Sequence, residues 1–180
     1  MNRRRMKVGS FAFMARAAAK EPTLGAALQG ALRFLHLVFD DFSPRLEVRD
    51  GLAAIVVDEA PEQSCRAFGY FTLWLIIHGL SCWLAGRRIA ILAIDLRCAE
   101  PPFCDDYRVM FSENLQFGRP RTRMIIAADC LDVPLKRTPE ELQRFLAEAP
   151  GNILVKYRDP ASLARRIRHD LLALDPASWP

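Results

Sequence analysis

Apolar residues recur at helical spacing in the first part of the chain and then give way to alternation. Thr23 is placed to cap a helix that runs to about Phe39. The apolar stripe of this helix consists of Leu24, Leu28, Leu32, Leu35 and Phe39. Residues 45–49 and 52–58 then flank Asp50-Gly51, a two-residue spacing typical of a type I′ hairpin. The pattern therefore predicts a helix followed by two paired strands.

The longest apolar segment runs from Ala67 to Gly86 and contains no Asp, Glu, Lys or Arg over its 20 residues. That length is sufficient to cross a bilayer, so a membrane span is one interpretation. Small and polar residues interrupt the run, and no second apolar segment of that length accompanies it. Because the amphipathic elements on both sides need an apolar partner, we interpret the segment as a central buried helix that ends at Gly86.

After this helix the chain again shows the two-residue alternation that is typical of strands. Residues 89–99 predict a strand with Leu92, Ile94, Leu96 and Cys98 on one face and Ile91, Ala93, Asp95 and Arg97 on the other. A short extended piece is expected at residues 116–118. A further strand is predicted at residues 121–128, with one face formed by Thr122, Met124, Ile126 and Ala128.

Two helices near the end of the chain begin at a proline. Thr138-Pro139-Glu140-Glu141 is a capping box with proline at the first helical position, which predicts a helix over residues 139–149 that ends at Pro150-Gly151. Asp159-Pro160 predicts a last helix over residues 160–174. The expected fold class is α+β, a mostly antiparallel sheet packed against helices with the long apolar helix at the centre. We expect one domain over residues 9–180, after a basic, disordered stretch at residues 1–8.

The net charge of +4 and the pI near 9.0 raise the question of nucleic-acid binding. Arg3, Arg4, Arg5 and Lys7 supply four positive charges by themselves, which leaves 25 − 4 = 21 basic residues against 21 acidic ones. The remainder of the chain is neutral, so the basic balance does not indicate a DNA-binding face.

The candidate chemistry is sparse. The five cysteines form no C-x-x-C pair, which fits reduced, buried thiols in a cytoplasm, and His78 with Cys82 is a single possible ligand pair that does not make a zinc site. Nucleophile-elbow, phosphate-loop, zinc-protease and dinucleotide motifs are missing from the sequence. The adjacent carboxylates Asp105-Asp106 and Glu140-Glu141 diverge by about 100 degrees on a helix and cannot flank one substrate bond. We therefore expect that the protein is not an enzyme and that it binds no cofactor and no metal.

The order of local features between Arg97 and Leu135 is more specific. A strand ends at Pro101-Pro102, a short helix follows, and a turn through Arg119-Pro120 leads into the strand at residues 121–128. With Gly9-Ser10-Phe11 and the helix after Thr23, this order resembles the ligand-sensing, arabinose-binding and dimerisation domain of AraC-type transcriptional regulators. The segment from Leu171 to Pro180 is similar to the one that leads into the two helix-turn-helix motifs of those regulators.

This resemblance implies a cytoplasmic, bacterial sensor domain that binds a small effector, forms a homodimer and reaches DNA only through a C-terminal helix-turn-helix module absent from these 180 residues. The subfamily name does not identify the effector. The alternative is a standalone small-molecule-binding protein, or an enzyme, of the same fold. Codons beyond Pro180 would separate the two.

The candidate ligand site lies on the long apolar helix. At about 100 degrees per residue its polar-tipped residues fall within a sector of about 80 degrees; these residues are Tyr70, Trp74, His78 and Ser81. A cavity with aromatic walls and a few polar tips is typical of small-molecule sites. Arg97 would supply a positive charge for a carboxylate, and Tyr107 would close the mouth. The alternative is a boundary face whose polar tips reach water or backbone carbonyls.

The two C-terminal helices, residues 139–149 and 160–174, each carry an apolar stripe. Either the stripes pair with a second copy of the chain, or they close the core of the domain. The sequence leaves these two interpretations open.

Overall fold

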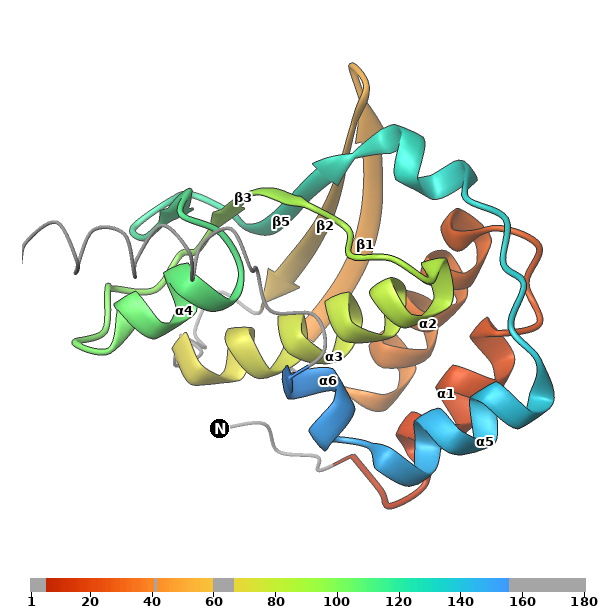
Figure 1. The fold of residues 1–180 in the computed structure, drawn as a ribbon. Coiled ribbons are helices and arrows are strands. Elements are labelled where there is room, and N and C mark those ends of the chain that lie inside the picture. Colours follow the sequence, from red (N-terminus) through yellow and green to blue (C-terminus); the bar gives the residue numbers. More distant parts are fainter. Residues whose placement is uncertain (1–5, 41, 60–66, 156–180) are drawn as a thin grey trace, which may run out of the picture.

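A computed structural model describes residues 6–40, 42–59 and 67–155 of the chain, and Figure 1 shows their arrangement. The sheet in this part of the chain has the strand order β1-β2-β5-β3-β4. Its strands are β1 (Phe42–Arg49), β2 (Leu52–Glu59), β3 (Ile91–Asp95), β4 (Leu115–Gln116) and β5 (Thr122–Ala127). Neighbouring strands are antiparallel except β3 and β4, which are parallel. The predicted α+β class with a mostly antiparallel sheet is therefore confirmed.

The hairpin of β1 and β2 turns at Asp50-Gly51 as the sequence predicts. Both residues have positive φ, 51° for Asp50 and 73° for Gly51, which is the conformation that a type I′ turn requires. The pairing starts at Arg49 with Leu52 and continues to Phe42 with Glu59, three residues further along β1 than the predicted strand. This extension brings Glu59 to the end of the sheet.

The helices of the described residues are α1 (Ser10–Ala18), α2 (Leu24–Val38), α3 (Ala67–Ala85), α4 (Cys104–Met110), α5 (Pro139–Glu148) and α6 (Gly151–Val155), with a 3₁₀ turn at Ala128–Asp132. The predicted caps are present. Thr23 accepts a hydrogen bond from the backbone N–H of Ala26, and both halves of the capping box form at Thr138 and Glu141. Gly86 has a φ of 71° directly after α3.

α3 is the core helix of the domain. It packs against α2 and α6 (Figure 1), and its side chains join the same apolar cluster as the inward residues of the sheet. Among the described residues, α3 is the helix that is long and apolar enough to cross a membrane. However, 72% of its most apolar stretch is buried inside the domain. That burial is what a core helix shows, and the predicted central buried helix is confirmed.

Three element predictions need correction. β3 is shorter than residues 89–99, and its register shifts between Ile91 and Ala93, so Leu92 turns outward and is 44% exposed while Ile91 is buried. An extra residue in one strand reverses the side-chain alternation beyond it, which the sequence pattern did not reveal. Ala128 belongs to the 3₁₀ turn and not to β5. After Pro150 the chain resumes as the short helix α6, which was not predicted.

Some predictions fall on parts of the chain outside the described residues. They are the prediction of disorder for residues 1–5, the prediction of a last helix over residues 160–174, and the prediction that Cys65 is a reduced, buried thiol. The described part of the predicted disordered stretch includes Met6, which is half-buried and packs against the core.

Candidate functional site

The inward face of β2 ends on an acidic residue. Strand alternation places Glu59 on the same face as Ala53, Ile55 and Val57, all of which are buried in the core cluster. The Glu59 side chain is only 3% exposed. Because a buried carboxylate needs a partner to offset its lost hydration, the groups around Glu59 decide what this end of the sheet can do.

Arg97 is the charged group closest to this carboxylate in the described part of the chain. Its Nη1 lies 3.9 Å from Oε2 of Glu59, which is an ion-pair distance but too long for a hydrogen bond. The backbone N–H of Arg97 donates to the Oγ1 of the fully buried Thr122 at 3.2 Å, which fixes the chain beside β5. The other carboxylate oxygen, Oε1, is buried and has no hydrogen-bond partner among the described residues.

A series of aromatic contacts connects β1, through the strand partner of Glu59, to α3 and α4. Phe42, the strand partner of Glu59, meets the ring of Tyr70 edge-on at 6.0 Å between centroids. The adjacent Phe71 stacks on Tyr107 of α4 at 3.4 Å. Burial raises the pKa of the Tyr107 hydroxyl, with a smaller contribution from Asp106. The first turns of α3 thus join the end of the sheet to α4.

Trp74 lies one turn after Tyr70 and is fully buried. Its indole Nε1–H is a buried donor without a hydrogen-bond partner in the described residues. Native interiors leave few such groups unpaired, so an unpaired donor on the same helix face as Tyr70 calls for an explanation. We refer to the pair of Glu59 and Arg97, together with Tyr70, Trp74 and Tyr107 of α3 and α4, as the Glu59 cluster.

The other two predicted ligand residues, His78 and Ser81, lie further along α3 and already have partners. Nε2 of His78 lies 2.8 Å from the carbonyl oxygen of Ile89, and the hydroxyl of Ser81 donates to the carbonyl of Ile77 at 2.8 Å. Burial lowers the pKa of His78 to about 4, so the neutral ring donates its Nε2–H to Ile89. Binding of a ligand by His78 and Ser81 stays a prediction, whereas Trp74 of the same stripe carries a donor without a partner among the described residues.

The pair formed by His78 and Cys82 is close in space. Their Nε2 and Sγ atoms are 3.3 Å apart, and the Sγ accepts a hydrogen bond from the backbone N–H of Ile89. Burial raises the pKa of the Cys82 thiol to about 11, so it stays protonated. Within the described residues no group of three or more potential metal ligands gathers. This pair therefore joins α3 to the chain that follows it.

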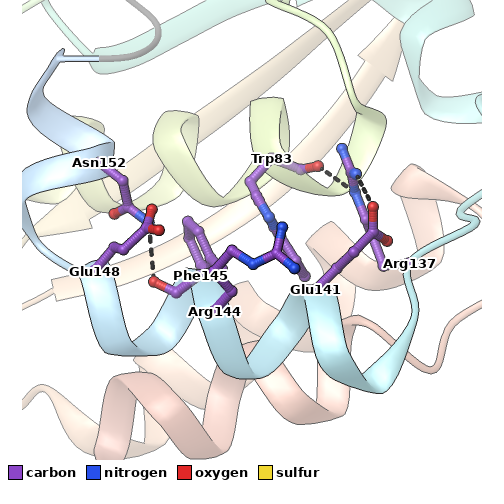
Figure 2. A pocket seen from close by; sticks show the side chains of 7 residues that line it. All are labelled: Trp83, Arg137, Glu141, Arg144, Phe145, Glu148 and Asn152. Carbon is purple, nitrogen blue, oxygen red and sulfur yellow. Dashed lines mark hydrogen bonds and ion pairs between the residues drawn. The ribbon is translucent and has the colours of Figure 1, made fainter.

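Glu59 was not among the predicted site residues. The signal was available, because alternation from Ala53 through Ile55 and Val57 places Glu59 on the core face. It was missed because the strand was predicted to end at Asp58. A second feature that sequence reasoning missed is a pocket between α3, α5 and α6, which is lined by other residues (Figure 2).

The family of the chain follows from its sequence. Residues 2–135 match the family described as the arabinose-binding domain of AraC transcription regulators, in its N-terminal part. The match spans well over half of the chain and includes the whole Glu59 cluster. The chain belongs to this family. No curated protein matches the chain.

The match confirms the family resemblance seen in the sequence. Members of this AraC family domain are ligand-binding parts of transcription regulators and not enzymes. The matched region ends at Leu135, before the capping box of α5. It therefore contains the sheet, α3 and α4, but not α5 and α6.

Proposed function

We propose that this chain is the effector-sensing domain of a bacterial, cytoplasmic AraC-type regulator, and that the effector binds at the Glu59 cluster. One observation carries the proposal: the buried Oε1 of Glu59 and the buried Nε1–H of Trp74 both lack partners among the described residues, inside the region that matches a ligand-binding family. A bound molecule would supply both missing hydrogen bonds.

The chemistry of the cluster defines the class of effector. Glu59 accepts hydrogen bonds, so the effector presents a hydroxyl or amine donor to its carboxylate. Trp74 and Arg97 donate, so the same molecule carries an acceptor such as an ether, carbonyl or carboxylate oxygen. The rings of Tyr70 and Tyr107 favour an apolar face on the ligand. A small, partly apolar molecule with both donors and acceptors meets these requirements.

The position of the cluster suggests how an effector would act. Arg97 is 43% exposed and stands in the loop between β3 and α4, while Tyr107 belongs to α4 itself. An effector that contacts Arg97 and the aromatic rings would favour the arrangement in which α4 lies tightly on α3. An effector shifts the equilibrium of a sensor only when it binds one arrangement of the domain more tightly than the other.

The thermal shift caused by a panel of metabolites tests the proposal. The panel is screened against the wild type, Glu59→Gln and Trp74→Phe, with Glu21→Gln as an exposed acidic control. We expect at least one compound whose stabilisation is lost or strongly reduced in the first two variants and kept in the control. For each variant, the melting temperature with a compound is compared with that of the same variant without it, so a change in the stability of the unliganded variant does not affect the comparison.

His78→Gln belongs to the same screen because it separates the two halves of the predicted stripe. A compound that stabilises every variant equally, or one whose effect depends on His78 alone, would place the effector site away from Glu59. A screen in which no compound stabilises the wild type would also count against the site.

We also propose that the full regulator is a homodimer, as regulators that read two half-sites commonly are. The stripe of α5 is partly used inside the domain, because Phe145 is buried against Trp83 and Phe11. Leu142 and Leu146 of the same helix remain half-buried. Light scattering at concentrations on the order of tens of micromolar tests self-association, and a strict monomer would contradict it for this chain.

A further inference from the structure

A pocket of about 110 Å³ lies between the end of α3, α5 and the start of α6 (Figure 2). It shares no residue with the Glu59 cluster, and apart from Trp83 its lining residues follow Leu135, beyond the region matched by the family. Its properties therefore have to be worked out from this chain alone.

The wall of the pocket is a pair of stacked aromatic rings. Trp83 and Phe145 lie 4.3 Å apart between centroids, with an interplanar angle of 14°. Both residues are buried, so the stack is a fixed part of the core and not a mobile surface group. The rings supply an apolar surface on which the hydrocarbon part of a ligand packs.

One side of the pocket is already satisfied by protein groups. The Nε–H of Arg137 donates to the carbonyl of Trp83 at 2.7 Å, and its Nη1 lies 3.3 Å from Oε1 of Glu141. Its guanidinium is 5.2 Å from the Trp83 ring centroid. The backbone N–H of Thr138 holds the pKa of Glu141 below its usual range, and Arg137 adds to this effect. These two residues hold the pocket in shape.

Two charges at the rim remain available for a ligand. Arg144 and Glu148 lie one turn apart on α5 and are exposed, and neither lies within ion-pair distance of another described residue. The charge of Arg144 also contributes, from further away, to the lowered pKa of Glu141. Figure 2 shows them on opposite sides of the Phe145 ring, with Arg144 toward Glu141 and Glu148 toward Asn152. The pocket thus presents the Arg144 guanidinium, next to the paired Arg137 and Glu141, at one end and the Glu148 carboxylate at the other.

Asn152 gives independent evidence for a ligand at the Glu148 end. Its Nδ2 donates to the carbonyl of Phe145 at 2.9 Å, which orients the amide. Its Oδ1 is buried and has no hydrogen-bond partner among the described residues. An unpaired buried acceptor beside a carboxylate is a site for a donor with positive charge, such as an ammonium group.

We propose that this pocket binds a small zwitterionic amino acid. The ligand carboxylate pairs with Arg144, its ammonium group donates to Glu148 and to Oδ1 of Asn152, and its carbon atoms lie against the rings of Trp83 and Phe145. The small volume favours compounds of the size of glycine and alanine over drug-sized ligands. The lining charges Arg137, Arg144, Glu141 and Glu148 sum to zero, which matches a ligand without net charge.

Calorimetric titration of the 180-residue protein with glycine, L-alanine, β-alanine and γ-aminobutyrate tests the proposal. Acetate and methylamine, which carry only one of the two charges, are titrated in parallel. We expect at least one zwitterion to bind at least ten times more tightly than both single-charge compounds. Backbone amide shifts in an NMR titration should concentrate on Phe145 and Asn152.

Arg144→Gln and Glu148→Gln are the decisive variants, with Arg33→Gln on the exposed side of α2 as the matched control. Both rim residues are exposed, so folding is expected to survive their substitution. Binding should weaken at least tenfold in each rim variant and stay unchanged in the control. The absence of zwitterion binding, equal affinity in the rim variants and the wild type, or amide shifts that concentrate elsewhere would overturn the proposal.

Discussion

His78 is a titratable group that packing keeps neutral. Its ring lies in the core between α3 and the segment that leads into β3, where Nε2 meets the carbonyl of Ile89. Burial disfavours the charged form, and the nearby Arg88 disfavours it further, which together lower the pKa to about 4. The hydrogen bond to Ile89 acts in the opposite direction and does not compensate.

The stability of the domain should therefore fall with acid because of this one residue. The pKa of about 4 in the folded state lies below the ordinary 6.5, so the unfolded chain binds the proton more tightly. The contribution of the neutral His78 ring to the free energy of unfolding is fully present above pH of about 6.5 and decreases as the pH falls toward 4. It amounts to about 3 kcal/mol in total. Urea denaturation of the wild type and His78→Gln at a series of pH values measures it.

His36 provides the control for this series, since it lies exposed on α2. The pH dependence of the free energy of unfolding should persist in His36→Gln and become shallower in His78→Gln. If His78→Gln keeps the full slope of the wild type, the acid sensitivity belongs to other groups.

Among the elements, α5 begins with reciprocal hydrogen bonds. The hydroxyl of Thr138 accepts from the backbone N–H of Glu141 at 3.2 Å, and the carboxylate of Glu141 accepts from the backbone N–H of Thr138 at 2.9 Å. These bonds satisfy backbone donors that the helix itself leaves without partners. The start of α5 is thus set by local chemistry.

Thr138→Ala should lower the free energy of unfolding by about 1 kcal/mol, the usual cost of losing a side-chain cap. Thr72→Ala is the matched control, because the hydroxyl of Thr72 bonds to the carbonyl of Phe68 within α3 and caps nothing. Urea denaturation at neutral pH compares the two variants. Equal losses in both would mean that the capping hydrogen bonds add no stability at this helix start.

The contact of α3 with α6 depends on a glycine. A Cβ added at Gly79 would overlap Cγ2 of Ile153, a branched side chain buried at the start of α6. A glycine inside a helix normally costs stability relative to alanine, so its presence here reflects the close approach of α6.

Gly79→Ala should consequently destabilise the domain by about 1–3 kcal/mol, although alanine is the better helix former. The same substitution made together with Ile153→Ala should be neutral or stabilising relative to Ile153→Ala alone, because the overlapping methyl group is gone. A double-mutant cycle measured by chemical denaturation gives the coupling. Independent, additive effects of the two substitutions would contradict the contact.

For the whole molecule, the distribution of charge bears on DNA binding. Basic side chains on the outer face of the sheet are engaged with acids: Arg45 pairs with Asp58 and Glu47, Arg121 also with Glu47, and Arg123 with Asp95. Outside Arg3, Arg4, Arg5 and Lys7 the charges balance at 21 of each sign. Paired charges do not form the basic face that a DNA backbone requires.

We therefore expect the 180-residue protein not to recognise DNA by itself. In an electrophoretic mobility titration at physiological salt, it should cause no sequence-specific retardation at sub-micromolar concentration. Residual binding through the N-terminal arginines should disappear as salt rises and should not depend on sequence. Tight, sequence-specific retardation would show that these residues contain a DNA-reading surface of their own.

Local chemistry in the sequence was enough to determine several features of this protein. Asp50-Gly51 predicts the hairpin because few residues other than glycine, asparagine and aspartate adopt positive φ readily, and Thr138 with Glu141 predicts a helix start because their side chains satisfy nearby backbone donors. The uncharged run at Ala67–Ala85 predicts a buried helix because apolar surface leaves water. Each signal acts within a few residues of its cause.

The tertiary structure decided which distant groups meet. Glu59 lies at the end of β2 and Arg97 in the loop after β3, Gly79 and Ile153 come from different helices, and the stack of Trp83 on Phe145 joins α3 to α5. The sequence named Arg97 and Trp74, but not Glu59, the buried acid that pairs with Arg97. A residue pattern encodes which side of an element faces the core, whereas the partner on that side depends on how whole elements pack, which no local pattern specifies.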